Sequence, residues 1–265
     1  MFRKNIKTNW WEDIFDQKYL DTYIDINTPT STDREIRFLE KNFNLVGAVN
    51  ILDLACGYGR HSIPLAKLGY KVTGIDYSDY FLNLAKDSAK KEKVIINFKK
   101  ENMIDFDTTE QFDAIINMFT SFGYFDNMSD NKKVLSNVYQ SLKKGGIFIL
   151  DFNNIFKTVT RVGNDGKITK NGIIENEYME DLSNGLNVKT ENIIDLVTQT
   201  WEIKRTWQDS SNKNQTYAAK FRLFTPYEIK MLLIDTGFIV LDYFGDFDNS
   251  FFDFKSPRFI ILVKK

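Results

Sequence analysis

The chain has 265 residues, and 43% of them are hydrophobic, which suffices for one large α/β domain or for such a domain with an insert. The formal net charge is −1 and the pI is about 6.0, which argues against nucleic acid as the main partner because phosphate binding needs a basic face. One cysteine excludes an internal disulfide, and the sequence has neither a signal-peptide core nor an apolar run near the ~20 residues of a membrane helix. We therefore expect a cytoplasmic protein that works without a membrane.

Residues 9–43 are predicted to be helical. Aromatic and aliphatic residues recur at helical spacing up to Tyr23, and a break around Pro29 separates them from a second helix expected over 34–43. Thr32 or Asp33 can cap this second helix. The aromatic cluster admits two interpretations, a helix packed on a sheet or a lid over a bound cofactor. We treat residues 1–50 as an N-terminal helical lid.

Residues 51–76 follow the order strand, glycine-rich loop, helix, strand. Gly57 and Gly59 let the backbone turn tightly and let a ligand lie against it, because neither carries a Cβ. The N-terminus of the following helix offers unpaired N–H groups to an anionic group. Asp76 ends the second strand and offers two acceptors to a ribose diol. The stretch therefore predicts a nucleoside-binding βαβ unit.

The identity of the nucleoside depends on two positions in this loop. A dinucleotide fingerprint needs a third Gly or Ala three places after the second glycine, where this chain has Ser62. Asp53 lies four residues before Gly57, and a carboxylate there suits a ligand that carries an ammonium group. The stretch resembles motif I, D-x-x-x-G-x-G, of the class I S-adenosylmethionine-dependent methyltransferases. The resemblance continues through GYKVTGIDYS at 69–78, whose acid is the ribose ligand of that family.

The resemblance implies S-adenosylmethionine as cofactor and S-adenosylhomocysteine as product. Asn102 stands where the family usually has an acidic residue that contacts the adenine amine, and its side-chain oxygen can accept the same hydrogen bond. The cofactor-binding residues expected on this basis are Asp53, Ala55, Gly57, Gly59, Asp76, Tyr77, Asn102, Met103, Asn117 and Phe119.

The βα alternation continues to residue 152. Ser78 can cap a helix that runs to about Lys91, and the later strands are expected over 94–99, 111–117 and 147–152. A helix over 130–143 should end at the cations and glycines of 143–146 in a left-handed stop. Ligands bind outside the carboxyl ends of parallel strands, which favours the loop 118–125 as the reacting centre. We name Ser121 and Tyr124 there as candidate substrate residues.

Residues 157–222 break this rhythm. Residues 159–168 look like a loop, with a turn at 163–166. Strand-like runs follow at 173–179, 187–196, 199–207 and 216–223. We expect an antiparallel β insert that carries the candidate substrate residues Trp207 and Arg222. Its aromatic side chains exceed what a small surface ribbon can bury, so the insert is expected to form either a substrate lid or a dimer interface.

The chain returns to the first pattern at its end. Thr225, Pro226 and Glu228 form a capping box for a helix that runs to Asp235, and strands are expected at 238–244 and 258–265. A final hairpin on a parallel sheet is typical of the family. The resemblance thus implies a doubly wound seven-stranded, mostly parallel α/β sheet of order 3-2-1-4-5-7-6. The predicted cofactor domain covers 51–156 and 223–265.

Methyl transfer from a sulfonium is an in-line displacement in which the protein positions a nucleophile and excludes water. His61 is the only side chain of the loop with an unperturbed pKa near neutrality, so we name it as a candidate catalytic base, with a structural role as the alternative. Cys56 is expected to be a packing residue. Arg60 either pairs with an acid of the lid or is solvated. With one histidine and one cysteine, the sequence shows no metal-ligand cluster.

The predicted function is methyl transfer to N, O or C of a small-molecule acceptor. Asn117 is not followed by the Pro-Pro-Tyr or Pro-Pro-Phe of many methyltransferases that act on nucleobases or glutamine. The alternatives left open are an RNA or protein methyltransferase, an NAD-dependent oxidoreductase and a non-catalytic cofactor-binding module. The expected partner is the acceptor, with no nucleic acid and no membrane, and a homodimer is one option.

Overall fold

The computed structural model describes residues 6–45, 49–164, 166–168 and 171–265. The chain divides into two compact units. The larger unit contains residues 29–122, 127–154 and 225–265. The described part of the smaller unit contains residues 6–28, 123–126, 155–164, 166–168 and 171–224. The segment 1–50, expected as one helical lid, is therefore divided between the two units.

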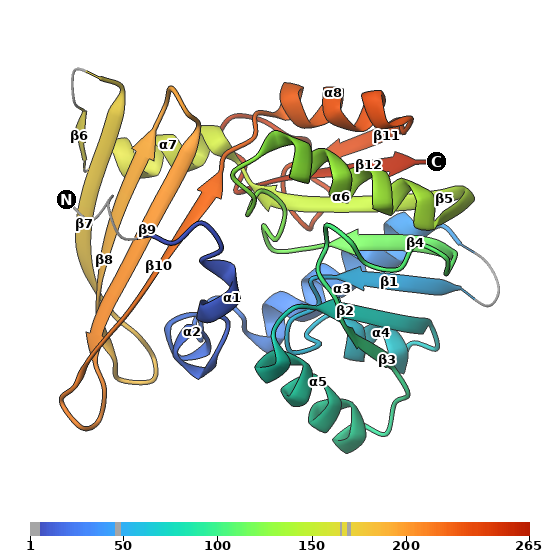
Figure 1. Ribbon diagram of the computed structural model, residues 1–265, viewed down its shortest axis with the longest axis horizontal. Coiled ribbons are helices and arrows are strands. Elements are labelled where there is room, and N and C mark those ends of the chain that lie inside the picture. Colours follow the sequence, from blue (N-terminus) through green and yellow to red (C-terminus); the bar gives the residue numbers. More distant parts are fainter. Residues whose placement is uncertain (1–5, 46–48, 165, 169–170) are drawn as a thin grey trace. The chain divides into compact units, whose positions relative to one another are not determined.

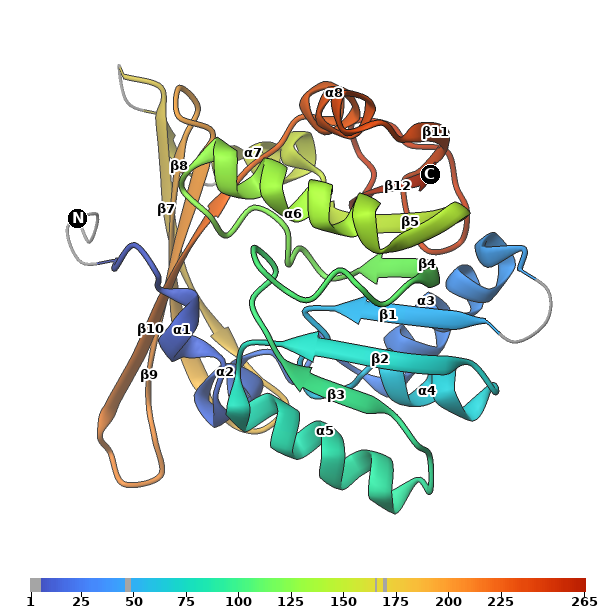
Figure 2. The same ribbon diagram turned by 45° about the vertical axis from the view of Figure 1, so that its right-hand side comes forward.

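The larger unit is built on a seven-stranded sheet. Its strands are β1 (Asn50–Leu54), β2 (Lys71–Asp76), β3 (Asn97–Lys100), β4 (Phe112–Asn117), β5 (Leu142–Asn153), β11 (Ile239–Phe244) and β12 (Arg258–Lys264). Their order is β11-β12-β5-β4-β1-β2-β3, with β12 antiparallel to both neighbours and the other pairs parallel. This confirms the predicted order. Figure 2 shows the carboxyl ends of β1, β2 and β4 at one edge of the sheet.

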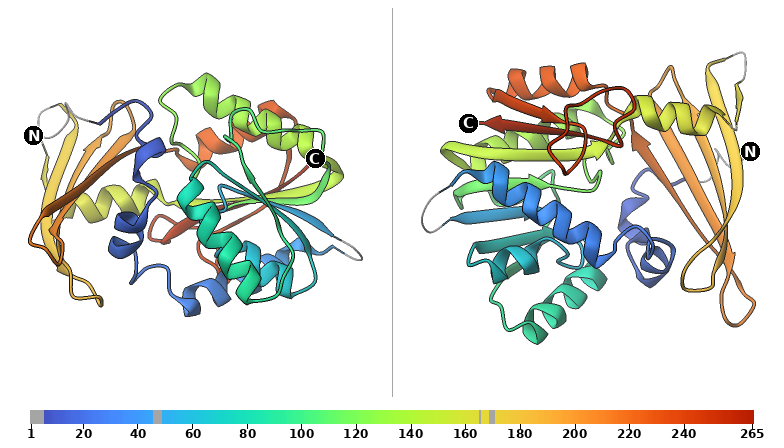
Figure 3. Two further views of the ribbon diagram at one scale, coloured as in Figure 1. Left: turned by 60° about the horizontal axis from the view of Figure 1, so that its bottom comes forward. Right: turned by 180° about the vertical axis from the view of Figure 1, so that it is seen from behind.

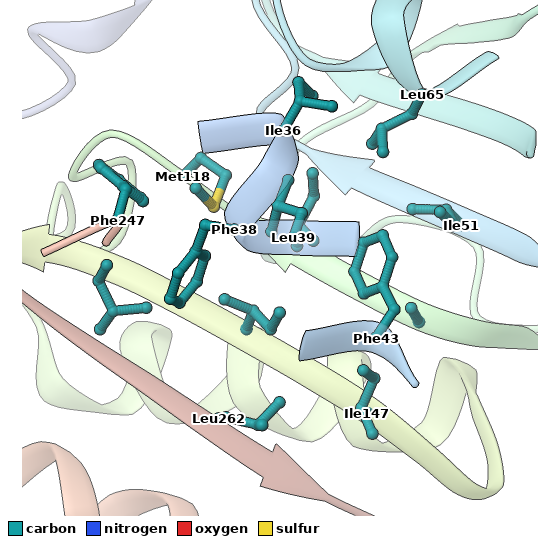
Figure 4. Close-up of a cluster of buried hydrophobic side chains, with 14 of the residues drawn as sticks. Ile36, Phe38, Leu39, Phe43, Ile51, Leu65, Met118, Ile147, Phe247 and Leu262 are labelled. Atoms are coloured by element: carbon teal, nitrogen blue, oxygen red, sulfur yellow. The ribbon is translucent and has the colours of Figure 1, made fainter. Parts of the chain in front are cut away.

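Five helices pack with this sheet. They are α3 (Pro29–Phe43), α4 (Ser62–Lys67), α5 (Asp79–Lys91), α6 (Met128–Ser141) and α8 (Pro226–Thr236). Figures 1 and 3 show α3 and α6 on opposite faces of the sheet. Phe38, Leu39 and Phe43 of α3 are buried against apolar side chains of β1, β5 and β12, and Figure 4 shows part of this cluster. This burial of apolar area is what ties α3 to the sheet.

Three local predictions differ from the structure. Helix α3 begins at Pro29 rather than at Arg34, because proline fits the first turn, where its missing N–H is not needed. Helix α6 ends at Ser141, and residues 142–146 extend β5 instead of forming a glycine stop. Leu142 pairs with Phe112 of β4, and the backbone of Lys265 bonds Gly145 and Gly146 at 3.0 and 2.9 Å. The ammonium of Lys143 also bonds both oxygens of Asp113 at 2.9 Å. Strand β3 begins at Asn97 rather than at Val94.

The smaller unit contains an antiparallel sheet. Its strands are β6 (Lys167–Ile168), β7 (Ile173–Asp181), β8 (Asn187–Asp195), β9 (Thr200–Gln208) and β10 (Asn214–Arg222), in the order β10-β9-β8-β7-β6. The four predicted strands are confirmed. The loop expected over 159–168 is wrong for its first part, which belongs to α7 (Ile155–Asn164). Ile155 and Val162 lie on one buried side of α7, which packs on β7 and β8. Asp165 of the expected turn lies outside the described residues.

Two short helices, α1 (Trp11–Ile14) and α2 (Gln17–Thr22), belong to the smaller unit. The ring of Trp10 lies 5.2 Å from that of Phe221 on β10, between ring centroids. Arg205 of β9 donates a hydrogen bond to the carbonyl oxygen of Thr22 at the end of α2. The Ser183 N–H donates to the Asp25 carboxylate at 2.9 Å. These contacts make residues 6–28 part of the same folded body as the insert.

Candidate active site

The glycine loop lies at the carboxyl end of β1 and is held by Asp76. The N–H of Gly57, whose φ is +56°, donates to Oδ2 of Asp76 at 2.8 Å, and the N–H of Ser78 donates to Oδ1 at 2.8 Å. The backbone N–H of Tyr77 also bonds this carboxylate, which leaves part of its acceptor capacity for a further donor. Burial raises the pKa of Asp76 to about 6, although the backbone hydrogen bonds oppose this shift. The group is therefore a desolvated carboxylate with acceptor capacity left over.

Asp53 lies deeper in the same edge. Its side chain is buried, and its Oδ2 accepts a hydrogen bond of 2.6 Å from the hydroxyl of Ser62, the first residue of α4. Burial raises the pKa of Asp53, against the opposing effects of His61, of the Ser62 hydrogen bond and of Arg60. Asp53 thus joins the end of β1 to the start of α4, and a contact with a ligand ammonium stays a prediction.

The other side of the loop is bound to α3 through Glu35. Its Oε2 lies 2.6 Å from Nη1 of Arg60 and 2.5 Å from Nε2 of His61, and both Glu35 and His61 are buried. Burial opposes ionisation of Glu35, yet the hydrogen bond and charge of His61, together with Arg60, lower the pKa of this carboxyl overall. Arg60 is therefore paired with an acid of α3 and is not solvated. The geometry favours a positioning role for His61.

Asn117, the last residue of β4, has an unused acceptor. Its Nδ2 donates to the carbonyl oxygen of Leu54 at 2.8 Å and lies 3.7 Å from the sulfur of Met103. Its Oδ1 is buried and has no hydrogen-bond partner among the described residues. Because a buried acceptor without a partner costs free energy, this atom is suited to a ligand donor. Nearby in sequence, the Oδ1 of Asn102 already accepts from the Ile104 N–H at 3.1 Å.

Comparison with known proteins agrees with this geometry. A family model described as a methyltransferase domain matches residues 51–146. A glycine/sarcosine N-methyltransferase of Halorhodospira halochloris is 26% identical and covers 96% of this chain and 91% of its own length. A ubiquinone biosynthesis O-methyltransferase of Coxiella burnetii is 30% identical, over 46% of this chain and 51% of its own. A structure of an S-adenosylmethionine-dependent methyltransferase of Clostridium acetobutylicum superposes with a TM-score of 0.80 at 21% identity, covering 94% of this chain and 98% of its own, which shows a shared fold.

Residues 51–146 form a methyltransferase domain, and the chain has the fold of S-adenosylmethionine-dependent methyltransferases. Among the described residues of this methyltransferase, no group of three or more histidine, cysteine or acidic side chains is placed to hold a metal ion. No helix in the described ranges is both long and apolar enough to cross a membrane.

The structure separates the predicted site residues of the methyltransferase into two sets. The larger unit holds His61, Ser121 and all ten of the expected cofactor-binding residues, among which Tyr77 is exposed. The smaller unit holds Tyr124, Trp207 and Arg222. Trp207 is buried with Val188 and Tyr217 in the core of that unit, which favours a packing role. The Ser121 hydroxyl donates to the carbonyl oxygen of Met118 at 3.0 Å.

The sequence analysis did not predict three charged residues of the larger unit that form hydrogen-bonded contacts at the carboxyl edge of the sheet. They are Glu35 of α3, Asp151 of β5 and Arg258 of β12. Asp151 is a lone acid inside an apolar strand, and a buried charge is rare without a partner, so its position was a usable signal. Nothing local in the sequence indicates which residue is the partner of Glu35.

We expect His61→Asn to lower turnover only modestly and to leave the shape of the pH–rate profile intact. The reason is that the contact of Nε2 of His61 with Oε2 of Glu35 ties the glycine loop to α3, and an asparagine can keep part of this contact. The measurement is kcat across pH 5–9, with the thermal midpoint recorded alongside, because the variant changes a buried contact with Glu35. Loss of a limb near neutral pH would instead make His61 the base.

Proposed function

We propose that this methyltransferase binds S-adenosylmethionine at the carboxyl edge of β1, β2 and β4 and methylates a nitrogen of a small-molecule acceptor. The observation that carries the proposal is that Asp76 keeps part of its acceptor capacity and that Oδ1 of Asn117 is buried without a partner among the described residues. A ribose diol supplies two hydroxyl donors, and an ammonium group supplies three N–H donors. The residues present therefore fit the nucleoside and amino-acid ends of this cofactor.

The chain's own residues would bind and orient the cofactor and exclude water from it. Asp76 would hold the ribose, Gly57 and Gly59 would let the backbone approach the cofactor, and Asn117 would accept from the ammonium. The bound cofactor supplies a methyl group on a positively charged sulfur, which is already an activated donor. Placing the acceptor in line with this donor can contribute roughly 7–11 kcal/mol, so a strong base is not required.

The choice of nitrogen as the methylated atom is supported by the length of the alignment with each relative. The glycine/sarcosine N-methyltransferase aligns over 265 residues and thus includes the insert, whereas the O-methyltransferase aligns over 124 residues. The acidic pI and the absence of Pro-Pro after Asn117 also favour a small molecule over a nucleobase or a protein amide. A primary or secondary amine would react as its neutral form, because only that form has the lone pair that attacks the methyl group.

Calorimetry with S-adenosylhomocysteine and with NAD tests the cofactor. We expect binding of the sulfur nucleoside and much weaker binding of NAD, because Ser62 occupies the third glycine position of a dinucleotide loop. Tight binding of NAD with no response to S-adenosylhomocysteine would contradict the proposal.

Radiolabelled methyl transfer to a panel then tests the acceptor. The panel contains small amines such as glycine and sarcosine, small phenols, unmodified RNA and a mixture of unmodified peptides. We expect label in the amines. Label confined to phenols would overturn the nitrogen acceptor, and label in RNA or peptide would overturn the small-molecule class, while leaving the cofactor assignment intact.

A further inference from the structure

Two consecutive residues after β4 adopt a conformation that their side chains disfavour. Phe119 has φ +60° and Thr120 has φ +62°, in the left-handed region that normally selects glycine. A β-branched threonine there is a genuine outlier. Such strain persists only where the surrounding structure holds it, and it concentrates at functional sites. The turn directly follows Asn117 and Met118 at the carboxyl end of β4.

Asp151 of β5 holds the backbone of this turn. Its Oδ2 accepts from the Phe119 N–H at 2.8 Å, and its carbonyl oxygen accepts from the Thr120 N–H at 3.1 Å. The hydroxyl of Thr120 accepts from the Asn153 N–H at 3.0 Å. One residue of a neighbouring strand thus satisfies both N–H groups of the strained pair, which is possible because β4 and β5 are parallel neighbours.

Arg258, at the start of β12, holds Asp151 in turn. Its Nε and Nη2 lie 2.7 and 2.8 Å from the two carboxylate oxygens of Asp151, a bidentate pair. Its Nη2 also donates to the hydroxyl of Thr120 at 3.1 Å, and its Nη1 donates to Oδ1 of Asn153 at 2.6 Å. The Asp151 side chain is 1% exposed and that of Arg258 12% exposed, so these contacts face little competition from water.

The Phe119 side chain connects this network to the glycine loop. The guanidinium carbon of Arg258 lies 5.8 Å from the centroid of the Phe119 ring, and that of Arg60 lies 5.3 Å from it. Both distances are within the range of a cation–π interaction. Because Arg60 is bound to Glu35, the ring of Phe119 has charged neighbours that are themselves fixed.

We propose that Arg258 is a positioning residue of the methyltransferase, which acts through Asp151 to keep the Phe119–Thr120 turn in its left-handed conformation for cofactor binding. This inference rests on the proposed function, since it takes Phe119 as a cofactor-binding residue. A lysine at 258 keeps the charge but loses the planar fork, so it cannot bond both oxygens of Asp151 and Thr120 together. The turn would then relax toward negative φ.

A double-mutant cycle with S-adenosylhomocysteine as the probe tests this role. Calorimetry would compare wild type, Arg258→Lys, Thr120→Gly and the double variant, below the thermal midpoint of each. We expect Arg258→Lys to weaken binding about 10-fold, a loss of about 1.4 kcal/mol. Glycine accepts the left-handed conformation without the support of Arg258, so the double variant should bind within about 3-fold of Thr120→Gly.

The matched control is Lys143→Met, which removes a cation paired with an acid of β4 at the opposite end of the same two strands. It should lower the thermal midpoint and leave affinity unchanged. If Arg258→Lys binds as the wild type does, or if Thr120→Gly gives no recovery in the double variant, the positioning role is wrong. If wild type itself does not bind the probe, the cofactor assignment fails instead.

Should Arg258→Lys not fold, a second variant tests the same role. Asn153→Ala removes one partner of Arg258 and is expected to weaken binding about 3-fold. Unchanged affinity of this variant would again contradict the role.

Discussion

Asp76→Ala should weaken the binding of S-adenosylhomocysteine about 10- to 150-fold. Hydrogen bonds to a charged carboxylate are worth roughly 1.5–3 kcal/mol, and the variant removes the acceptors proposed for the ribose diol. It also removes the acceptor of the Gly57 N–H, so the glycine loop loses its support from β2. Both effects act in the same direction, which places the result toward the upper part of this range.

The affinity of the wild type should fall in acid. The free protein has Asp76 with a pKa of about 6, because burial disfavours the charged form. Ribose hydroxyls would donate to the carboxylate and favour that charged form, so the pKa in the complex lies lower. Binding is then independent of pH above about 6 and weakens as pH falls below it, because the acid must first lose its proton. Calorimetry from pH 5 to 8 measures this slope, which Asp76→Asn should abolish.

Asp79→Asn is the matched control for both measurements. Asp79 lies three residues away in the first turn of α5, is exposed, and pairs with Lys100. We expect less than a 2-fold change in affinity and an unchanged pH dependence. An Asp76→Ala protein that is folded and binds with the affinity of the wild type would reduce Asp76 to a support of the loop.

Removal of residues 1–28 and 157–222, which form most of the smaller unit, should abolish methyl transfer and leave cofactor affinity within a few-fold. The ten expected cofactor-binding residues lie in the larger unit, whereas the candidate substrate residues Tyr124, Trp207 and Arg222 lie in the smaller one. The variant lacks residues 1–28 and replaces 157–222 with a Gly-Ser linker. Both segments are removed together because α2 is bonded to β9, and deleting one would expose the apolar surface of the other.

The readouts are S-adenosylhomocysteine calorimetry, methyl transfer to the acceptor found by the panel, and light scattering. Thermal unfolding confirms that the remaining unit is folded. Shortening the exposed turn 209–213 between β9 and β10 is the control and should change none of the readouts. Normal transfer by the truncated protein would contradict the role of the smaller unit in acceptor selection. A change from dimer to monomer would instead identify this unit as the interface.

The glycine loop and Asp76 could be predicted because they depend on neighbours in sequence. Gly57, Asp76 and Ser78 lie within 22 residues, and the strand–loop–helix–strand order brings them together without help from the rest of the chain. The capping box of α8 was equally local, and the structure contains both of its hydrogen bonds between Thr225 and Glu228. Alternating apolar and polar residues were likewise enough to predict four strands of the insert.

The missed features depend on distant contacts. His61 and Glu35 are 26 residues apart, and Arg258 and Asp151 are 107 apart, so only the folded sheet pairs them. The sequence of α7 predicts a loop because its threonines and Gly163 are weak helix formers, yet packing on β7 and β8 makes it helical. Residues 142–146 extend the strand because Leu142 pairs with Phe112 of β4 and the two glycines bond the backbone of Lys265, although the glycines alone favour a turn.

The amino-acid sequence was thus sufficient for most of the helices and strands and for the glycine loop, because hydrophobic period and short-range turn chemistry decide them, whereas the strand order came from the resemblance to a known family. Tertiary structure decided which charges meet at the carboxyl edge of the sheet. It paired Glu35 with Arg60 and His61, and it placed Arg258 on Asp151 beside the strained residues Phe119 and Thr120. A buried charge requires a partner but does not specify where along the chain that partner lies. The partner of Asp151 is supplied only when β12 pairs with β5 in the folded sheet.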